Sequence, residues 1–340
     1  MTSGAAGRRR TLATAVVCGA VVLTVSVAAC GSGGASGLAS AAGVGRSEAS
    51  AGSATSQAGS SSSAGSSAQA SPAGPAGDRT STAASSPAGT QAVDPEKADP
   101  FSSAVDQYLA GRSGTVLAAV YDVRTGQSWR LGDGPAQDEA SVVKVDILEA
   151  LLSESDGTGL SAGNQPLAGQ MIEDSDNDAA TSLWYAAGGT AGLAAYNDRA
   201  GLARTTPSAC VVCAGFPWPG WGLTTTVPYD QITLLKQLIK PGPLLTADER
   251  KYALSLLENV TPGQAWGVSG GVPAGVTVAL KNGWLPLNDD NTDWQVNSEG
   301  WVSGDGRDYL ICVLTTGNPT EQYGIDTISE LSTLIWAALR

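Results

Sequence analysis

One stretch of the chain reads ASVVKVDILEALL, from Ala140 to Leu152. Its apolar residues recur at helical spacing, so it predicts a helix that starts close to Ser141. Lys144 follows Ser141 by three positions, which places both side chains on one face of the helix. A desolvated lysine can take the proton of a neighbouring hydroxyl, and a helix N-terminus favours a developing oxyanion. The pair is therefore a candidate serine nucleophile with its base, in a chain that contains no histidine.

The same pair also has a purely structural interpretation. Serine is favoured at helix N-termini because its hydroxyl accepts a hydrogen bond from a free backbone N–H. A lysine one turn later can simply be solvated. A serine placed three residues before a lysine is a common arrangement in a chain of 340 residues. Other parts of the chain must therefore decide between catalysis and helix capping.

The N-terminal segment predicts export. Residues 1–29 combine a run of arginines, Arg8 to Arg10, with an apolar stretch of small residues, which is typical of a secretory signal peptide. The end of this segment, Val-Ala-Ala before Cys30, resembles a bacterial lipobox. The resemblance implies a lipid on Cys30 that anchors the protein to the outer face of the bacterial cell membrane. The alternative is an ordinary signal peptide with an incidental cysteine, and the arginines leave Sec and Tat export open.

Composition separates a tether from a folded domain. Residues 30–97 consist mainly of Ala, Gly, Ser and Thr, which predicts a disordered tether. Residues 98–340 are long enough to bury one substantial core. The chain carries 19 basic and 32 acidic side chains, and its net charge of −13 argues against nucleic acid as a partner. We expect a monomer that meets the membrane through the lipid on Cys30 and binds a small-molecule or peptide substrate.

The cysteines of the folded domain leave a choice of disulfides. In an oxidising compartment, Cys210 and Cys213 can pair with each other, or either can pair with Cys312. The Cys-x-x-Cys spacing also occurs in thiol redox proteins, but here it lies among Pro and Gly rather than between a strand and a helix. The chain does not group enough further ligands for zinc, so we expect no metal site and no cofactor.

The rest of the pattern predicts strands on either side of a block of helices. Strand-like runs cover residues 115–123, 127–131, 276–285, 294–303 and 309–316, and helical runs cover residues 99–110, 165–172, 178–187, 190–200, 228–240, 246–258 and 325–339. This order predicts an α/β domain of the α+β type, with a five-stranded antiparallel sheet flanked by helices plus an all-helical subdomain. Residues 203–227 form a long loop rich in Pro, Gly and Trp, and loops of this length are commonly functional.

Two further motifs accompany the serine–lysine pair. Ser-Asp-Asn occupies residues 175–177, in a predicted loop between two helices, and Lys-Asn-Gly occupies residues 281–283, in a predicted strand. In this order, the three motifs resemble those of the penicillin-recognising serine enzymes, and most closely those of the class A β-lactamase-like domain. The resemblance covers most of residues 98–340 and implies the β-lactamase/transpeptidase-like fold.

The resemblance implies a role for each matching residue. Ser141 would be the nucleophile and Lys144 its base, while Ser175 would pass a proton to the leaving group. Asn177 would hold the substrate amide, and Lys281 would attract a substrate carboxylate and align Ser175. The structural alternatives are turn formation and helix capping by the asparagine, and solvent exposure of the strand lysine.

The chain also departs from this family. The backbone N–H groups of Ser141 and Trp284 would form the oxyanion hole, beside Gly283. Asn282, however, stands where the family has a threonine or serine whose hydroxyl binds the substrate carboxylate. The family also has a loop glutamate that positions the water that hydrolyses the acyl-enzyme, whereas residues 199–229 contain no acidic side chain. Deacylation is therefore expected to be slow.

These observations predict a cell-surface serine hydrolase of β-lactamase-like or D,D-peptidase-like type. It would be a lipoprotein that forms an acyl-enzyme through Ser141 and acts on β-lactams or on D-amino-acid peptides of the cell wall. The alternative belongs to another functional class, namely a binding or sensor lipoprotein that keeps the fold but is catalytically impaired.

Overall fold

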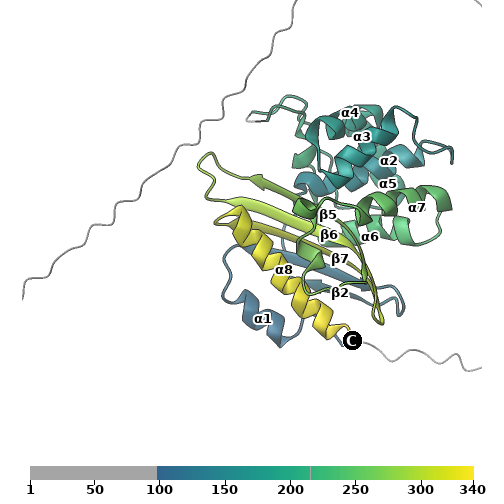
Figure 1. Ribbon diagram of the computed structural model, residues 1–340. Helices are drawn as coiled ribbons and strands as arrows, with labels where there is room; N and C mark the ends of the chain where they lie inside the picture. The colour runs from purple at the N-terminus through teal and green to yellow at the C-terminus, as the bar shows by residue number, and fades with distance from the viewer. Residues whose placement is uncertain (1–97, 215) are drawn as a thin grey trace, which may run out of the picture. The chain divides into compact units, whose positions relative to one another are not determined.

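The computed structural model describes residues 98–214 and 216–340 (Figure 1). The predicted signal peptide of residues 1–29, the tether of residues 30–97 and the predicted lipid attachment at Cys30 lie outside the described residues. Within the described part, no helix is both long enough and apolar enough to cross a membrane.

A five-stranded antiparallel sheet forms the centre of the domain, as predicted. In space its strands follow the order β2-β1-β7-β6-β5. Their bounds are Thr115–Asp122 for β1, Ser128–Leu131 for β2, Thr277–Pro286 for β5, Trp294–Gly304 for β6 and Arg307–Asn318 for β7. β5 is an edge strand of this sheet, so its outer side is free to form one wall of a site.

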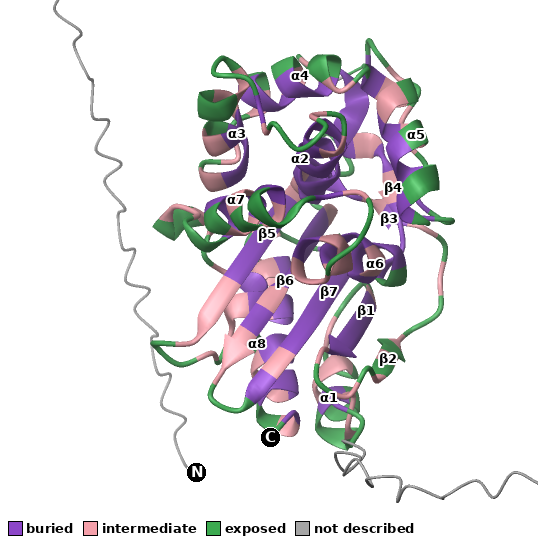
Figure 2. Ribbon diagram, turned by 90° about the vertical axis from the view of Figure 1, so that its right-hand side faces the viewer, coloured by how far each residue is buried: buried purple, intermediate pink, exposed green. Residues whose placement is uncertain are grey.

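Both faces of the sheet are covered, and the alternation of side chains explains why (Figure 2). Along β7, Leu310, Cys312 and Leu314 belong to one apolar core, while their neighbours Tyr309 and Ile311 belong to a second core on the opposite face. Alternate residues of a strand point to opposite faces, so a strand buried on both faces is apolar throughout. The central strands therefore carry two cores at once.

Helices at the two ends of the chain pack on one face of the sheet, and the intervening helices form the other core (Figure 1). The first group comprises α1 (Ser103–Leu109) and α8 (Glu321–Ala338), and the second comprises α2 (Val143–Ser153), α3 (Asn164–Glu173), α4 (Asn177–Ala186), α5 (Gly189–Ala200), α6 (Pro228–Ile239) and α7 (Ala247–Glu258). The helical subdomain expected from the sequence is thus present.

Three local features differ from the sequence-based expectation. Ser141 does not begin the α-helix but lies in a preceding 3₁₀ turn, η1 (Ala140–Val142). A small two-stranded sheet, β3 (Gln137–Asp138) with β4 (Thr225–Thr226), was not predicted because two-residue strands leave no periodic signal. The first helix is shorter than expected, since α1 begins only after Ser102.

Several carboxylic acids are buried behind the Ser141 turn, which is unusual for a protein core. Glu139, Asp146, Glu149 and Glu299 are all 0 % exposed. Burial raises the pKa of each of them above its ordinary value, to about 7 for Asp146. For Glu139, repulsion by Asp146 adds to the effect of burial in raising the pKa.

These acids make the stability of the fold depend on pH. Because the folded-state pKa of Asp146 lies above the ordinary value, its contribution is fully present in acid and is lost as pH rises towards 7. The free energy of unfolding should therefore fall between pH 5 and pH 7.5, by up to about 1.4 kcal/mol per pH unit for one such group. In Asp146→Asn this fall should be smaller, as measured by urea unfolding at each pH. The exposed loop variant Asp289→Asn should keep the wild-type slope, and equal slopes in all three proteins would refute the assignment.

Candidate active site

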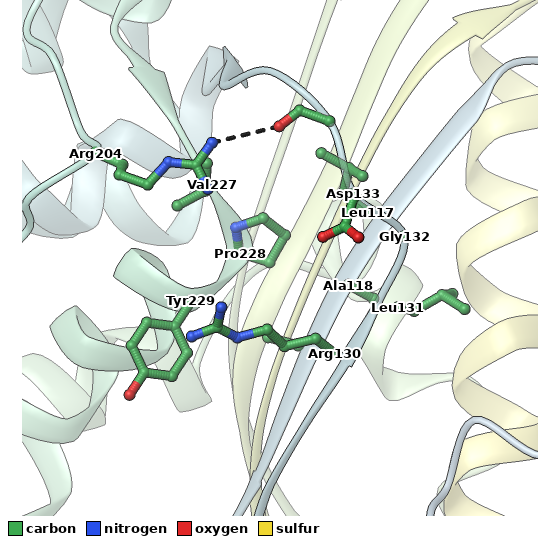
Figure 3. A pocket seen from close by; sticks show the side chains of 12 residues that line it. Leu117, Ala118, Arg130, Leu131, Gly132, Asp133, Arg204, Val227, Pro228 and Tyr229 are labelled. Atoms are coloured by element: carbon green, nitrogen blue, oxygen red, sulfur yellow. Dashed lines mark hydrogen bonds between the residues drawn. The ribbon is translucent and has the colours of Figure 1, made fainter.

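Ser141 follows a linker that connects the sheet to the helical subdomain and is held by contacts on both sides. After β2, Arg204 donates a hydrogen bond to the carbonyl oxygen of Gly134 at 3.3 Å (Figure 3). In the same hollow, the Arg130 guanidinium lies over the ring of Tyr229, 4.0 Å from its centroid. These contacts fix the linker against the start of α6, and β3 then pairs with β4. The turn that carries Ser141 is therefore held before the helix begins.

Backbone strain is concentrated at two points of this site. Among the described residues, five non-glycine residues have a positive φ, and three of these are Asp or Asn, which tolerate that region. The other two are Ala140 (φ 52°) and Ser175 (φ 59°). Strain of this kind persists only where the surrounding structure imposes it, and it is enriched at active sites.

Four of the predicted residues form one hydrogen-bonded group. Lys144 donates to Ser175 Oγ at 3.0 Å, to the Ser175 carbonyl oxygen at 2.6 Å and to Asn177 Oδ1 at 2.8 Å. Lys281 donates to the same Ser175 Oγ at 2.9 Å and to the carbonyl oxygen of Asn282 at 2.9 Å. The hydroxyl of Ser175 thus lies between two lysines that come from a helix and from an edge strand.

The surroundings of both lysines favour the uncharged amine. Lys144 is 0 % and Lys281 1 % exposed. Burial, together with repulsion by Lys281, lowers the pKa of Lys144 to about 6. Burial also lowers the pKa of Lys281 to about 7, against a smaller opposing effect of Glu299. Near neutral pH, Lys144 is mainly an uncharged amine, which is the form that a general base requires.

Ser141 itself stands apart from this group. Ser141 lines the same cavity as Asn177, but within residues 98–214 and 216–340 the hydrogen bonds of Lys144 Nζ are with Ser175 and Asn177 instead. The structure therefore brings the predicted base close to the relay serine and the predicted amide-binding residue. Transfer of a proton from Ser141 to Lys144 requires one of these hydrogen bonds to be exchanged.

Gly283 and Asn282 have different places in the site. A Cβ atom on Gly283 would lie 2.5 Å from the backbone nitrogen of Ser141, so only glycine allows β5 to pass this close to the turn. The amide of Asn282 donates to the carbonyl oxygens of Gln264, at 2.6 Å, and Trp266, at 3.1 Å, and the residue is 0 % exposed. A contact of this amide with a substrate carboxylate, at the position of the family's hydroxyl, would require these bonds to break.

The cavity beside Ser141 is lined largely by aromatic side chains. It has a volume of about 260 Å³, and Phe216, Trp218, Trp221, Trp284, Leu285 and Trp294 contribute to its walls. The sequence singled out the loop and Trp284, but nothing in its pattern indicated Trp294, because β6 could be placed without its register against β5. No Asp or Glu is among the lining residues, in keeping with the acid-free loop.

The loop of residues 203–227 contains a disulfide between Cys210 and Cys213, just before its Trp-rich part, while Cys312 is free and buried. Of the pairings left open by the sequence, the structure thus has the local one. Among the described residues, no group of His, Cys, Asp and Glu side chains has the arrangement of a metal site.

A family model described as "Beta-lactamase enzyme family" matches residues 154–339, more than half of the chain. The chain belongs to this family. The match begins after Lys144, so the assignment of Ser141 and Lys144 within this β-lactamase family rests on their position in the structure. The predicted family resemblance and the predicted fold are both confirmed.

Solved β-lactamases share the fold at low sequence identity. A β-lactamase from Chitinophaga pinensis superposes with a TM-score of 0.61 at 21% identity, over 70% of this chain and 98% of the other. The TLA-1 extended-spectrum β-lactamase gives a TM-score of 0.59 at 18% identity, over 70% and 97%. At these identities the likeness concerns the fold alone.

The curated relatives are mycobacterial. Proteins of Mycobacterium bovis and Mycobacterium tuberculosis that bear the name "Putative lipoprotein LppW" are 29% identical over 214 residues. The matched region covers 60% of this chain and 64% of theirs. This member of the β-lactamase family thus spans less than two thirds of the length of those relatives.

The close approach of β5 to the Ser141 turn can be tested with Gly283→Ala. The added methyl group meets backbone atoms, so the turn or the strand must move, and a shift of this kind can slow a reaction by about 100-fold. Labelling of Ser141 by a fluorophosphonate, followed by intact mass, should slow accordingly. Gly169→Ala, which meets no atom within 4 Å, is the matched control. Unchanged labelling in Gly283→Ala would show that the oxyanion side of the site is not formed here.

Proposed function

We propose that residues 98–340 form a serine hydrolase that is acylated on Ser141. The observation that carries this proposal is the convergence of Lys144 and Lys281 on Ser175 Oγ, beside the cavity that Ser141 and Asn177 line. A helix cap with a solvated lysine, the structural alternative, does not account for two buried lysines at one hydroxyl. β-Lactams and D-amino-acid peptides of the cell wall are the acyl donors expected from the sequence.

In the proposed acylation, Ser141 Oγ attacks the acyl carbon and forms a new C–O bond. Its proton passes to neutral Lys144, and from there through Ser175 to the leaving nitrogen or oxygen as the acyl bond breaks. The backbone N–H groups of Ser141 and Trp284 receive the oxyanion. Water later cleaves the ester, which releases the acid and restores the hydroxyl of Ser141.

We propose that this last step is slow. A positioned general base contributes about 10²–10⁴-fold to a rate, and no carboxylate lines the cavity. The buried acids behind the turn cannot serve, because Glu139 and Asp146 are 0 % exposed and therefore meet no bulk water. The acyl-enzyme should then outlast the acylation step.

The proposed location is the outer face of the bacterial cell membrane, through a lipid on Cys30. Two facts support it: the lipobox-like sequence before Cys30, and the similarity to proteins named as lipoproteins. A long tether between the anchor and the folded domain would let the domain reach substrates away from the membrane.

One observation favours a second candidate, a binding or sensor module that no longer turns over. The hydrogen bonds of Lys144 Nζ are with Ser175 and Asn177 and not with Ser141, so the proton path from the nucleophile is not assembled in the described structure. Catalytic hydrogen bonds are often completed only when substrate binds, which is why we place hydrolysis first.

The nucleophile is tested by intact mass of the full-length protein after incubation with a fluorophosphonate and, separately, with benzylpenicillin. The wild-type protein should gain the mass of one fluorophosphonate adduct, and Ser141→Ala should gain none while keeping its unfolding temperature. Ser182→Ala, which removes an exposed hydroxyl on α4, should be labelled like the wild type. An adduct on the Ser141→Ala protein would exclude Ser141 as the nucleophile, and a folded wild type that stays unlabelled would favour the binding module.

The pH dependence of labelling tests the base. With the pKa of Lys144 near 6, the neutral amine increases as pH rises through this value. The rate of fluorophosphonate labelling should therefore rise from pH 5 to a plateau above pH 7, by about tenfold. A rate that is independent of pH over this interval would show that Lys144 does not accept the proton.

A further inference from the structure

The cavity beside Ser141 presents mainly apolar side chains to a ligand. Its walls come from the loop of residues 216–222, from the end of β5 and from the first residue of β6. Trp218 and Trp221 are stacked, with ring centroids 6.3 Å apart and planes inclined by 17°. Large aromatic walls gain affinity by burying apolar surface, and they prefer flat apolar partners.

Two of the four indole N–H groups in these walls are already engaged by the protein. Trp221 Nε1 donates to Thr181 Oγ1 at 3.2 Å, and Trp294 Nε1 donates to the carbonyl oxygen of Asn291 at 2.8 Å. Apart from Ser141 and Asn177, the side chains that line the cavity are apolar or aromatic. A ligand group that enters beyond the nucleophile therefore meets a mainly hydrophobic surface with few hydrogen-bond donors.

The cavity also has little to offer a carboxylate. Within the described residues, no arginine or lysine lines it. Lys281 is 1 % exposed, its pKa is lowered to about 7, and it is bonded to Ser175 Oγ and the carbonyl oxygen of Asn282. The amide of Asn282 is likewise bonded to two backbone carbonyl groups. A buried anion without a charged partner or spare donors is strongly disfavoured.

The size of the cavity fits a substituted ring. A cavity of about 150 Å³ can hold one benzene molecule. The 260 Å³ beside Ser141 is larger, and it can hold an aryl group together with the carbonyl and the short chain that reaches the serine. A single methyl group would leave most of it unfilled.

The disulfide holds this aromatic wall in place. Gly220 donates from its backbone nitrogen to the carbonyl oxygen of Cys210 at 2.8 Å. A Cβ atom at Gly220 would lie 2.4 Å from Cys213 Sγ, so the bridge packs directly on the start of the turn that carries Trp221. The wall is thus a supported surface and not merely a loop that happens to contain tryptophan.

We infer that the site selects uncharged acyl donors with an aromatic acyl group, and that it discriminates against donors that carry a carboxylate. The inference rests on the proposed acylation of Ser141, and it narrows the acyl donors expected from the sequence to those without a carboxylate. The substrate is a neutral ester, amide or lactam whose aryl group lies against Trp218, Trp221 and Trp294.

A matched set of esters tests this inference. The 4-nitrophenyl esters of acetic acid, 3-phenylpropanoic acid and adipic acid, the last as its monoester, share a leaving group and differ in the acyl end. For the full-length protein, kcat/KM for acylation should be at least about tenfold higher for the phenylpropanoate than for the acetate. The adipate monoester should react more slowly than the phenylpropanoate by a larger factor. Equal rates for the three esters, or a preference for the anionic ester, would overturn the inference.

A second pair isolates the charge in a lactam. Benzylpenicillin and its methyl ester have the same aromatic acyl group, and only the first carries a carboxylate. Adducts on Ser141, followed by intact mass, should form at least as fast with the methyl ester as with the free acid. Clearly faster acylation by the free acid would show that the site does bind a carboxylate.

Variants separate the wall from the nucleophile. Trp218→Ala and Trp294→Ala should each lower the phenylpropanoate-to-acetate ratio several-fold, because both rings are half-buried and line the cavity. Tyr185→Ala, which removes an aromatic ring that is 57% exposed on α4, should leave the ratio unchanged. If neither tryptophan variant changes the ratio, the aromatic wall does not select the acyl group.

The outcomes also distinguish the two proposals. Labelling of Ser141 without acyl preference overturns only the inference about the substrate. If Ser141 is not acylated at all, equilibrium binding decides instead, by quenching of tryptophan fluorescence with 2-naphthylacetamide and with 2-naphthylacetate. The wall still predicts that the wild-type protein binds the neutral amide more tightly than the carboxylate. It also predicts that Trp218→Ala binds the amide more weakly than the wild type does. Equal affinity for the two compounds would overturn the inference whether or not the protein is an enzyme.

Discussion

The hydrogen bonds of Ser175 Oγ with Lys144 and Lys281 join the two halves of this domain at one atom. One lysine comes from the first helix of the helical subdomain and the other from the edge strand of the sheet. Two ammonium groups that share one hydroxyl in a buried site repel each other, and both lose hydration. The arrangement is therefore energetically favourable only when at least one of the two amines is neutral. The chemistry proposed for Ser141 uses a protonation state that packing already favours.

The surrounding core also favours the uncharged forms of its ionisable groups. Glu299 lies opposite Lys281 in the register of β5 and β6, and Cys312 lies opposite Glu299 in the register of β6 and β7. Burial raises the pKa of Glu299 and of the Cys312 thiol, and it lowers that of Lys281. In each case desolvation favours the uncharged form. A row of ionisable groups across the sheet can thus remain in the core with little net charge.

The sequence was a good guide to the fold because periodicity and motif order are local properties. The five strands, the helical subdomain and the closing helix follow from runs of apolar residues, and the three motifs indicate which segments meet. The sequence could not show that Lys144 hydrogen-bonds to Ser175 and Asn177 rather than to Ser141, because this depends on how a left-handed backbone turn places Ser175. Nor could it place Trp294 in the cavity or the Asn282 amide on two backbone carbonyl groups, since both depend on strand register and loop packing.

The Cys210–Cys213 bridge has a consequence for when the protein acquires its properties. Thiols remain reduced in the cytoplasm and pair after export. The hydrogen bonds among the lysines, Ser175 and Asn177 do not involve the bridge, so this group does not depend on the disulfide for its contacts. The support of the Trp218–Trp221 wall arises only where the cysteines oxidise. The selectivity of the cavity would then depend on oxidation of the two cysteines, whereas the hydrogen-bonded group around Ser175 would not.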